Sequence, residues 1–461
     1  MGRKNNLGRD PVSSLILRLA VPTMLAQFIN VLYSIADRMF IGHIPEIGDP
    51  ALAGVGVCGP IVTLLSSFAF LVCQGGAPLL SMKMGEDDWD GASAILSNCM
   101  RLLLVLALAL SALFFVLRRQ LLWWFGASQN TFPYALTYLT IYIAGTAFSL
   151  MSTGLNSFLI CQGRSGLGMG TVVLGAVLNI VLDPLFIFAL NMGVAGAAWA
   201  TLISQAASCF FALVCLRRRS MPVPLRLGRF DWGLCCKVLT FGSAPFLTIA
   251  SDSVLLIVLN TVLQRFGGPG EGDTLLTCTA IVQSYMLLIT MPLGGITLGC
   301  QSAVSFNYGA GNATRVKQAL RAISLLCVAF AALMLVITHL CSPAFVRLFT
   351  QNRSLMDQSV SYLKIYTAAV VPLAVQYVVV DQSTALGQVR LALFCSMFRK
   401  GLFLVATLIL PALFTVQATF WAEPLCDVVA ACVSSLLFLR IIPRLLLERA
   451  QKVDSLPRNT L

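Results

Sequence analysis

Two carboxylates in the first half of the chain stand inside long apolar segments, each with a polar residue one helical turn before it. Asp37 follows Tyr33 by four residues, and Asp183 follows Asn179 by four. Residues four apart lie on the same face of a helix, so each pair would present its oxygens together. A carboxylate in a membrane-spanning helix costs roughly 2.5–3.5 kcal/mol to insert, and such residues therefore mark ion or substrate pathways.

Asp37 and Asp183 are predicted to lie at the same depth in a membrane. Asp37 comes 19 residues after Arg18, and Asp183 comes 19 residues after Arg164. At about 1.5 Å per residue, each carboxylate would lie about 28 Å from the basic residue at the inner end of its helix. Thr201 stands seven or eight residues into a segment that runs inward, about 11 Å from its outer end. The two acids and the threonine could therefore line one pocket in the outer half of the membrane.

These oxygens suit the binding of a hard cation. Pro184 has no N–H to donate to the carbonyl of Ile180, which leaves that oxygen free beside Asp183. Two carboxylates, an amide oxygen, a hydroxyl and a free carbonyl are ligands that Na⁺ accepts. The carboxylates could instead hold a proton, because apolar surroundings and a neighbouring carboxylate both disfavour the charged form. The predicted coupling-ion site comprises Asp37, Asn179, Asp183, Thr201 and Tyr33.

Each of these residues also has a purely structural interpretation. Asp37 could form an interfacial ion pair with the adjacent Arg38, and Asp183 with Pro184 could mark only a helix kink. Tyr33 could belong to the belt of aromatic residues at the membrane surface. The residues alone leave these alternatives open.

The second half of the chain has acids of its own within apolar segments. They are Asp252, Asp381, Glu423 and Asp427. Glu423 and Asp427 are four residues apart and share a helix face. Asp252 comes 15 residues after Lys237, which places it about 22 Å from the inner face, near the middle of the bilayer. With Glu423 and Asp427 it is a candidate for a second protonation site or for binding an organic cation.

Asp381 and Arg399 are predicted to form a buried ion pair. Asp381 lies nine residues before Arg390 on a segment that runs inward, and Arg399 lies nine residues after it on the next segment. Both side chains would lie about 14 Å from the inner face. Pairing would offset part of the cost of burying either charge, so a structural role is expected for Arg399.

These residues need helices that cross a membrane, and the composition of the chain predicts such helices. Apolar residues make up 58% of the 461 residues and charged residues 11%, against roughly 25% charged residues in soluble domains. A helix needs about 20 apolar residues to cross a bilayer. Twelve segments qualify, at residues 13–41, 51–82, 94–117, 131–160, 166–190, 193–216, 234–264, 274–306, 318–340, 355–386, 390–414 and 417–441. The predicted fold is an all-α membrane protein with twelve transmembrane helices, and a soluble multidomain fold is excluded.

The basic residues predict the orientation of the chain. With the N-terminus inside, 24 of the 31 Lys and Arg residues flank the inner ends of the segments and 7 lie on the outer side. This excess predicts that both termini are cytoplasmic. Because the basic residues sit at segment ends, the net charge of +12 is attributed to membrane orientation, and no nucleic-acid partner is expected.

The chain is predicted to consist of two six-helix halves. The predicted parts are an N-terminal bundle at residues 1–216, a cytoplasmic linker at 217–236, a C-terminal bundle at 237–441 and a cytoplasmic tail at 442–461. A shift of 224 residues places Gly75 on Gly299 and Gly85 on Gly309. Because six is an even number, the halves share one topology and are related by a pseudo-twofold axis along the membrane normal. Two facing bundles would enclose a cleft, as alternating access requires.

Several motifs resemble those of multidrug and toxic compound extrusion (MATE) transporters. Residues 294–302 with 307–312 resemble the second-half signature, 33–37 with 40–42 the first helix, 179–184 the fifth helix, and 421–427 the last helix of bacterial members. The resemblance covers the chain from about residue 13 to residue 440. It implies a Na⁺- or H⁺-coupled antiporter that exports amphipathic organic cations, with the coupling-ion site at the residues of the first half. Some relatives place coupling acids in the second half, so the choice of half stays open.

The resemblance also implies a setting for the protein. It implies a multi-pass protein of the bacterial cytoplasmic membrane, expected to be a monomer. Its partners would be small cationic or amphipathic molecules and the lipid bilayer. No cofactor and no metal are expected beyond Na⁺ or H⁺ as the coupling ion.

Two other functions compete with a carrier of cations. An intramembrane enzyme is disfavoured, because the only two histidines are His43 and His339, and the 15 cysteines are scattered through apolar stretches without zinc-site spacing. A flippase for lipid-linked precursors on a related two-bundle fold remains the alternative. Such a flippase would need Arg or Lys in its cleft to meet pyrophosphate.

Overall fold

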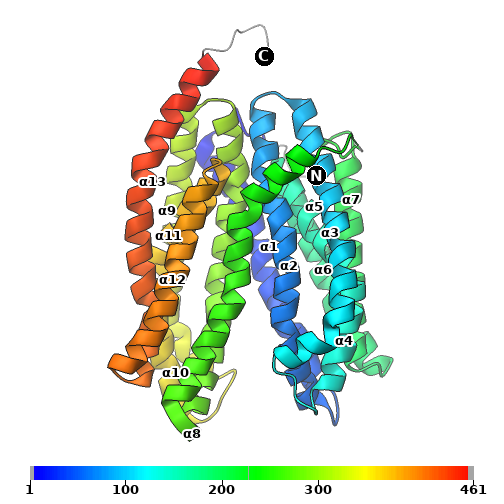
Figure 1. Ribbon diagram of the computed structural model, residues 1–461, viewed down its shortest axis with the longest axis vertical. Coiled ribbons are helices and arrows are strands. Elements are labelled where there is room, and N and C mark those ends of the chain that lie inside the picture. The colour runs from blue at the N-terminus through cyan, green and yellow to red at the C-terminus, as the bar shows by residue number, and fades with distance from the viewer. Residues whose placement is uncertain (1–4, 227, 455–461) are drawn as a thin grey trace.

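Every regular element in the described part of the chain, residues 5–226 and 228–454 of a computed structural model, is a helix (Figure 1). The first half contains α1 (Val12–Gly42), α2 (Gly48–Gly85), α3 (Trp89–Trp124), α4 (Phe132–Ala144), α5 (Thr146–Cys161), α6 (Ser165–Pro184), the π-helical η1 (Leu185–Ala189) and α7 (Val194–Arg217). The second half contains α8 (Trp232–Gly309), α9 (Ala313–Val346), α10 (Arg353–Tyr366), α11 (Val370–Ala385), α12 (Val389–Leu413), the 3₁₀-helical η2 (Val416–Trp421) and α13 (Ala422–Asp454).

The number of membrane-crossing helices agrees with the sequence. Among the described residues, ten helical stretches are long and apolar enough to cross a membrane, and two bent pairs raise the number to twelve. The bent pairs are α4 with α5, at 56°, and α10 with α11, at 46°. α8 supplies two of the ten stretches, Trp232–Gly268 and Thr274–Gly309, and Gly268 adopts a φ of +63° where they meet. The prediction of an all-α membrane protein is confirmed.

The helices pack into two groups, each with its own hydrophobic core. One core is formed by residues 41–238, and the other by residues 7–20 together with residues 259–446. In Figure 1 the group of α2–α7 and the group of α8–α13 approach each other at the upper end and diverge below. The first turns of α1 pack with the second group, although they belong by sequence to the predicted N-terminal bundle. The division of the chain at residues 216 and 236 stays a prediction.

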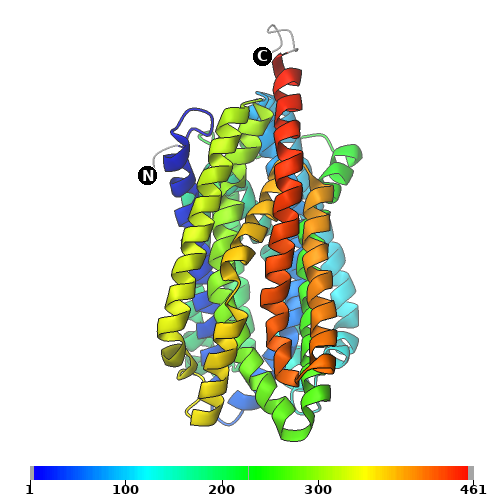
Figure 2. The same cartoon turned by 90° about the vertical axis from the view of Figure 1, so that its left-hand side faces the viewer.

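α13 is longer than the last predicted span. It continues past residue 441 to Asp454, along the whole length of the bundle (Figure 2). Ile442 and Leu446 are buried in the second core. The first part of the predicted tail is therefore helical and packed against the protein.

α2 and α8 cross at close range near the end that carries the chain termini. A Cβ atom added at Gly242 would overlap the carbonyl oxygen of Leu71, and one added at Gly85 would overlap that of Phe306. Gly309, which the internal repeat aligns with Gly85, lies on the same contact. Small residues let two helix backbones approach this closely, so the glycines hold the two groups together at this end.

The N-terminal segment forms hydrogen bonds with both groups at the same end. Asn5 Nδ2 donates to the carbonyl of Gly163, between α5 and α6, at 3.1 Å. The carbonyl of Leu7 accepts from Asn307 Nδ2 at 3.0 Å and from Arg315 Nη2 at 3.2 Å. The segment therefore bridges the first group and the second.

Arg449 of α13 makes a second bridge between the groups. Its Nη2 atom pairs with Glu86 Oε1 at 2.5 Å, directly after α2, and donates to the carbonyl of Gly309 at 2.8 Å. Its Nε atom donates to the carbonyl of Tyr308 at 3.2 Å. A cation beside the last carbonyls of a helix is favourable, so Arg449 joins the end of α8 to the first group.

Gly242→Ala is expected to loosen the crossing of α2 and α8, because the added methyl would overlap the Leu71 carbonyl oxygen. Overpacking costs about 1–3 kcal/mol, enough to shift a two-state equilibrium roughly 5–150-fold. Hydrogen–deuterium exchange measured by mass spectrometry should therefore be faster across residues 70–86. The control is Gly56→Ala on α2, the helix whose exchange is measured, because a Cβ at Gly56 meets no atom within 4 Å. Equal exchange in both variants would contradict a tight crossing.

Candidate functional site

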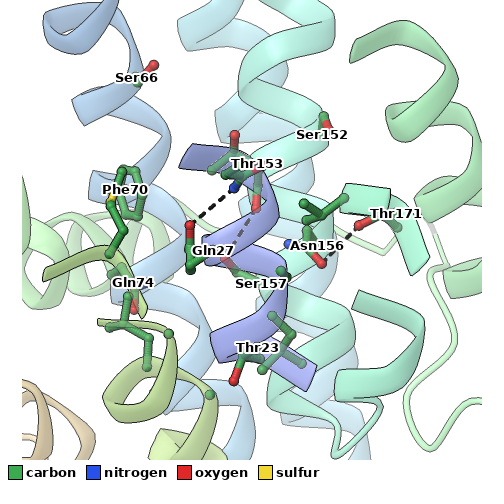
Figure 3. Close-up of a pocket in the computed structure, with 18 of the residues that line it drawn as sticks. Thr23, Gln27, Ser66, Phe70, Gln74, Ser152, Thr153, Asn156, Ser157 and Thr171 are labelled. Atoms are coloured by element: carbon green, nitrogen blue, oxygen red, sulfur yellow. Dashed lines mark hydrogen bonds between the residues drawn. The ribbon is translucent and has the colours of Figure 1, made fainter. Parts of the chain in front are cut away.

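A cavity of about 680 Å³ lies between the two groups of helices. Hydroxyl and amide side chains are numerous in its wall, among them Thr23 of α1, Gln74 of α2, Asn156 of α5 and Thr171 of α6 (Figure 3). Thr171 donates to Asn156 Oδ1 at 3.1 Å across this wall. Among the described residues that line the cavity, Asp252 is the one charged side chain, and none is Lys or Arg. The cavity wall therefore combines many polar side chains with a larger apolar surface, and it has a single acidic position.

Asn179 of α6 links two of the other residues predicted to bind the ion. Its Nδ2 atom donates to Asp183 Oδ1 at 3.3 Å and to Thr201 Oγ1 of α7 at 3.4 Å. Asn179 and Thr201 line the cavity, whereas the Asp183 side chain is fully buried behind them. The structure thus brings these three residues together beside the cavity.

Asp37 and Tyr33 of α1 complete the predicted set. Tyr33 lines the cavity, and the Asp37 carboxylate lies within electrostatic range of both Tyr33 and Asp183. Arg38 is exposed, and no ion pair between it and Asp37 is present in the described residues. The interfacial ion pair considered for Asp37 is therefore not formed.

Three oxygens in this group are buried without a hydrogen-bond partner in the described part of the chain. They are Asp37 Oδ1, Asn179 Oδ1 and Asp183 Oδ2. A buried acceptor without a partner costs about 1–3 kcal/mol, and more if it is charged. A cation or a proton bound by these oxygens would offset that cost and the repulsion between the two carboxylates. The group is therefore suited to hold Na⁺ or H⁺.

An irregular turn positions Asp183. α6 ends at Pro184 and continues as the π-helical turn Leu185–Ala189. Pro184 cannot donate to the carbonyl of Ile180, and π-helical turns occur frequently at functional sites. The break places Asp183 in the last turn of α6, next to α7 and its Thr201. The irregularity after Asp183 and Pro184 is this π-helical turn, within one membrane-length stretch, Ser165–Ala189, and it accompanies the polar contacts of Asn179.

A second polar cluster lies inside the second group of helices. Arg399 Nη2 of α12 pairs with Glu423 Oε1 at 2.5 Å, and Arg399 Nε pairs with Asp427 Oδ1 at 2.7 Å. Tyr366 Oη donates to Glu423 Oε2 at 3.3 Å and accepts from Gln283 Nε2 at 3.0 Å. Arg399 therefore has a structural role, and the four-residue spacing of the two acids lets both reach one guanidinium.

The predicted pair of Asp381 and Arg399 is wrong. Asp381 Oδ2 instead accepts a hydrogen bond from Thr297 Oγ1 of α8 at 2.5 Å, and the Asp381 carbonyl accepts from Gln301 Nε2 at 3.0 Å. The prediction rested on equal depth alone. Depth does not fix the direction in which a helix face points, and Asp381 faces α8 while Arg399 faces α13.

Asp252 and Lys400 form an ion pair that the sequence did not suggest. The Asp252 side chain is 54% exposed and lines the cavity, whereas the Lys400 side chain is 13% exposed behind it. Asp252 was expected beside Glu423 and Asp427, and its direct partner in the structure is this lysine. The sequence feature that could have indicated this ion pair is Lys400 itself, a charged residue within an apolar segment, next to Arg399. No sequence pattern pointed to Tyr366 or Thr297.

A bundle with up to twelve membrane-crossing helices and a cavity between its two groups is the architecture of an α-helical membrane carrier. The family model described as MatE matches residues 22–185 and again residues 248–409. The chain belongs to this family, the MATE transporters. Because the family consists of transporters, the prediction that the chain is not an enzyme is confirmed.

Two curated relatives illustrate the similarity. The multidrug export protein MepA of Staphylococcus haemolyticus is 21% identical over 441 residues, which are 95% of this chain and 96% of MepA. The probable multidrug resistance protein YpnP of Bacillus subtilis is 27% identical over 302 residues, which are 65% of this chain and 66% of YpnP. These relatives are bacterial, and this chain, like its family, is a multi-pass membrane protein.

Solved structures agree with the fold. A multidrug resistance MATE family transporter of the MOP superfamily, in its outward-facing conformation, matches with a TM-score of 0.89 at 23% identity, over 96% of this chain and 99% of that chain. A MATE in complex with MaL6 matches with a TM-score of 0.90 at 22% identity, over the same shares of the two chains. The MATE fold of the chain is thereby established.

Asp183→Asn is expected to raise thermal stability in Na⁺-free buffer at alkaline pH, where few protons are available. The neutral amide removes a buried negative charge and its repulsion with the Asp37 carboxylate, and a buried charged group without a partner costs at least about 1–3 kcal/mol. Thermal unfolding of the purified protein, followed with and without Na⁺, measures this gain and any stabilisation by the ion. The exposed Asp357→Asn on α10 is the matched control. A lower unfolding temperature for Asp183→Asn alone would show that its carboxylate is satisfied without an ion.

Proposed function

We propose that this chain is a secondary active transporter that exports amphipathic organic cations in exchange for Na⁺ or H⁺. The observation that carries the proposal is the group of unpaired buried oxygens of Asp37, Asn179 and Asp183 beside a cavity lined by both groups of helices. Export of several drugs is suggested by the relatives, which are named for multidrug export and multidrug resistance. Tyr33 and Thr201 would complete the coupling-ion site.

The proposed setting is the bacterial cytoplasmic membrane, with both chain termini in the cytoplasm. The excess of Lys and Arg on that side of the predicted spans supports the orientation. The transporter would work as a monomer, because the cavity is lined by the helices of one chain. Its two halves would act as the two moving bodies of alternating access.

The coupling mechanism would begin with entry of the ion from the outside. Binding between Asp37 and Asp183 would remove their repulsion and let α1 bend near Pro22, which lies inside the helix, or repack. Either change would alter the cavity wall formed by α1 and weaken the hold on the substrate. Such coupling is reciprocal, so bound substrate must weaken ion binding by the same factor.

The cavity has the groups that an amphipathic cation needs. Phe70, Tyr377 and Met291 provide aromatic and thioether surface, which binds apolar groups and organic cations. Asp252 provides one negative charge at the wall. The remaining wall offers apolar surface to bind the apolar part of a ligand and polar side chains to form hydrogen bonds with it.

The alternative of a lipid-linked precursor flippase is less well supported. A pyrophosphate ligand requires basic side chains, since Arg and Lys are the usual partners of phosphate. None of the described residues that line the cavity is Lys or Arg. The acidic wall favours a cationic substrate.

Asp37→Asn and Asp183→Asn are each expected to lower ion-driven ethidium efflux from proteoliposomes at least about tenfold. Each carboxylate would give a charge-assisted contact worth about 1.5–3 kcal/mol, and about 1.4 kcal/mol corresponds to a factor of ten. Asp357→Asn, an exposed acid on α10, should transport like the parent protein. Parent-like efflux by both Asp37→Asn and Asp183→Asn would remove the proposed ion site.

The coupling ion is identified by imposing one gradient at a time on proteoliposomes that contain the parent protein. An inward Na⁺ gradient at equal pH should drive ethidium export if the site takes Na⁺, and an inward proton gradient without Na⁺ should drive it if the site takes H⁺. The ion that is effective should lose its effect in Asp183→Asn. Absence of export with either gradient would contradict the proposed antiport.

A further inference from the structure

The ion pair of Asp252 and Lys400 is set by the packing of α8 against α12. One turn earlier on both helices, Thr248 and Ser396 are hydrogen-bonded to each other. Residues four apart lie on one helix face, so the two contacts fix the same register of α8 and α12. Asp252 therefore meets Lys400 because of helix packing, and the pair is not a chance contact of long side chains.

The two ends of this pair lie in different surroundings. Asp252 is 54% exposed and faces the cavity, while Lys400 is 13% exposed on the side away from it. Behind Lys400, the carboxylates of Glu423 and Asp427 lie within electrostatic range of its ammonium group. A lysine side chain is a flexible stem with a compact charge. Lys400 thus stands between an acid at the cavity and two acids in the interior.

The charges in this cluster do not balance. Asp252, Glu423 and Asp427 carry three negative charges when ionised, and Arg399 and Lys400 carry two positive charges. Asp427 Oδ2 is buried and has no hydrogen-bond partner in the described residues. An excess charge in an apolar interior is costly, so the cluster is neutral only when it takes up one proton or one further cation.

The remaining titratable groups around the cluster do not supply this charge. Tyr366, Tyr377 and Cys426 face Arg399 and its acids, and none of them becomes a cation. Asp381 is directed to Thr297 of α8. α1 and α2 contribute no charged side chain to the cavity wall in the described chain. The missing positive charge must therefore come from the solution.

We propose that Asp252 is a subsite for an organic cation and that Lys400 is its built-in competitor. When a cation binds Asp252, the displaced ammonium of Lys400 moves to Glu423 and Asp427 and replaces a proton held there. One cation bound then releases one proton, and the cluster stays neutral throughout. This inference rests on the proposed export of organic cations. It adds a local exchange of substrate for proton in the second half of the chain to the proposed coupling-ion site of the first half.

Two measurable properties follow from this exchange. The proton and the cation compete for one excess negative charge, so lowering the pH should weaken cation binding, and raising it should strengthen binding. Removal of Lys400 should separate cation binding from proton release. Asp252 is then free to bind the cation, and no ammonium group moves when Asp252 is occupied. Affinity should rise while proton release disappears.

The test is calorimetric titration of the purified full-length protein with tetraphenylphosphonium. The titration is repeated in buffers of different ionisation enthalpy. Together the titrations give the Kd and the number of protons released per cation bound. The parent protein should release up to one proton. Lys400→Gln should bind about tenfold more tightly, the factor expected if the competing pair leaves about a tenth of Asp252 free, and should release none. Lys400→Arg should behave like the parent, because it keeps the charge. Asp252→Asn should bind at least tenfold more weakly.

Lys317→Gln on α9 is the matched control, since Lys317 is exposed and lies away from the cavity wall. It should bind and release protons like the parent. Unchanged affinity in Lys400→Gln overturns the proposal, and so does proton release that survives in that variant. If the parent protein does not bind tetraphenylphosphonium at all, the proposed export of organic cations fails instead. The folded state of Lys400→Gln is checked by its binding, which is expected to be stronger than that of the parent.

Discussion

The structure depends on one constraint. Its apolar interior holds more negatively charged side chains than positively charged partners for them. In the first half, Asp37 and Asp183 have no basic partner among the described residues, and each has one oxygen without a hydrogen-bond partner there. In the second half, three acids share Arg399 and Lys400. Both imbalances adjoin one cavity between the halves. Because burial of unpaired charge is expensive, a small cation bound at either position would stabilise the conformation in which these acids are buried.

The sequence predicted the helices well, because helix formation in a membrane depends on local rules. Apolar length determines where a membrane-crossing helix forms, and a fixed rise per residue relates spacing to depth. The contact of Asn179 with Asp183 and Thr201 follows from this reasoning. The rotation of each helix about its axis depends on packing with its neighbours. The spacing of residues along one helix carries no information about that packing. For that reason Arg399 was assigned to Asp381 and is bound instead by the acids of α13.

Tertiary packing also explains why some helix limits differ from the predicted ones. The first turns of α1 are apolar enough to join the core of the second group, and α13 extends beyond the membrane-length segment because Ile442 and Leu446 are buried by its neighbours. The bends between α4 and α5 and between α10 and α11 interrupt apolar segments that read as continuous in the sequence. Hydrophobic length predicts that a segment crosses the membrane, but not its path.

The N-terminal segment has a consequence for the energetics of the transport cycle. Asn5 is bound to Gly163 in one group, and Leu7 is bound to Asn307 and Arg315 in the other. A rigid-body separation of the groups at this end has to break one of these attachments, each worth about 0.5–1.5 kcal/mol. The segment therefore stabilises the arrangement in which the two groups meet at this end. The free energy of ion binding would therefore have to offset the loss of these hydrogen bonds before the separated arrangement becomes the more stable one.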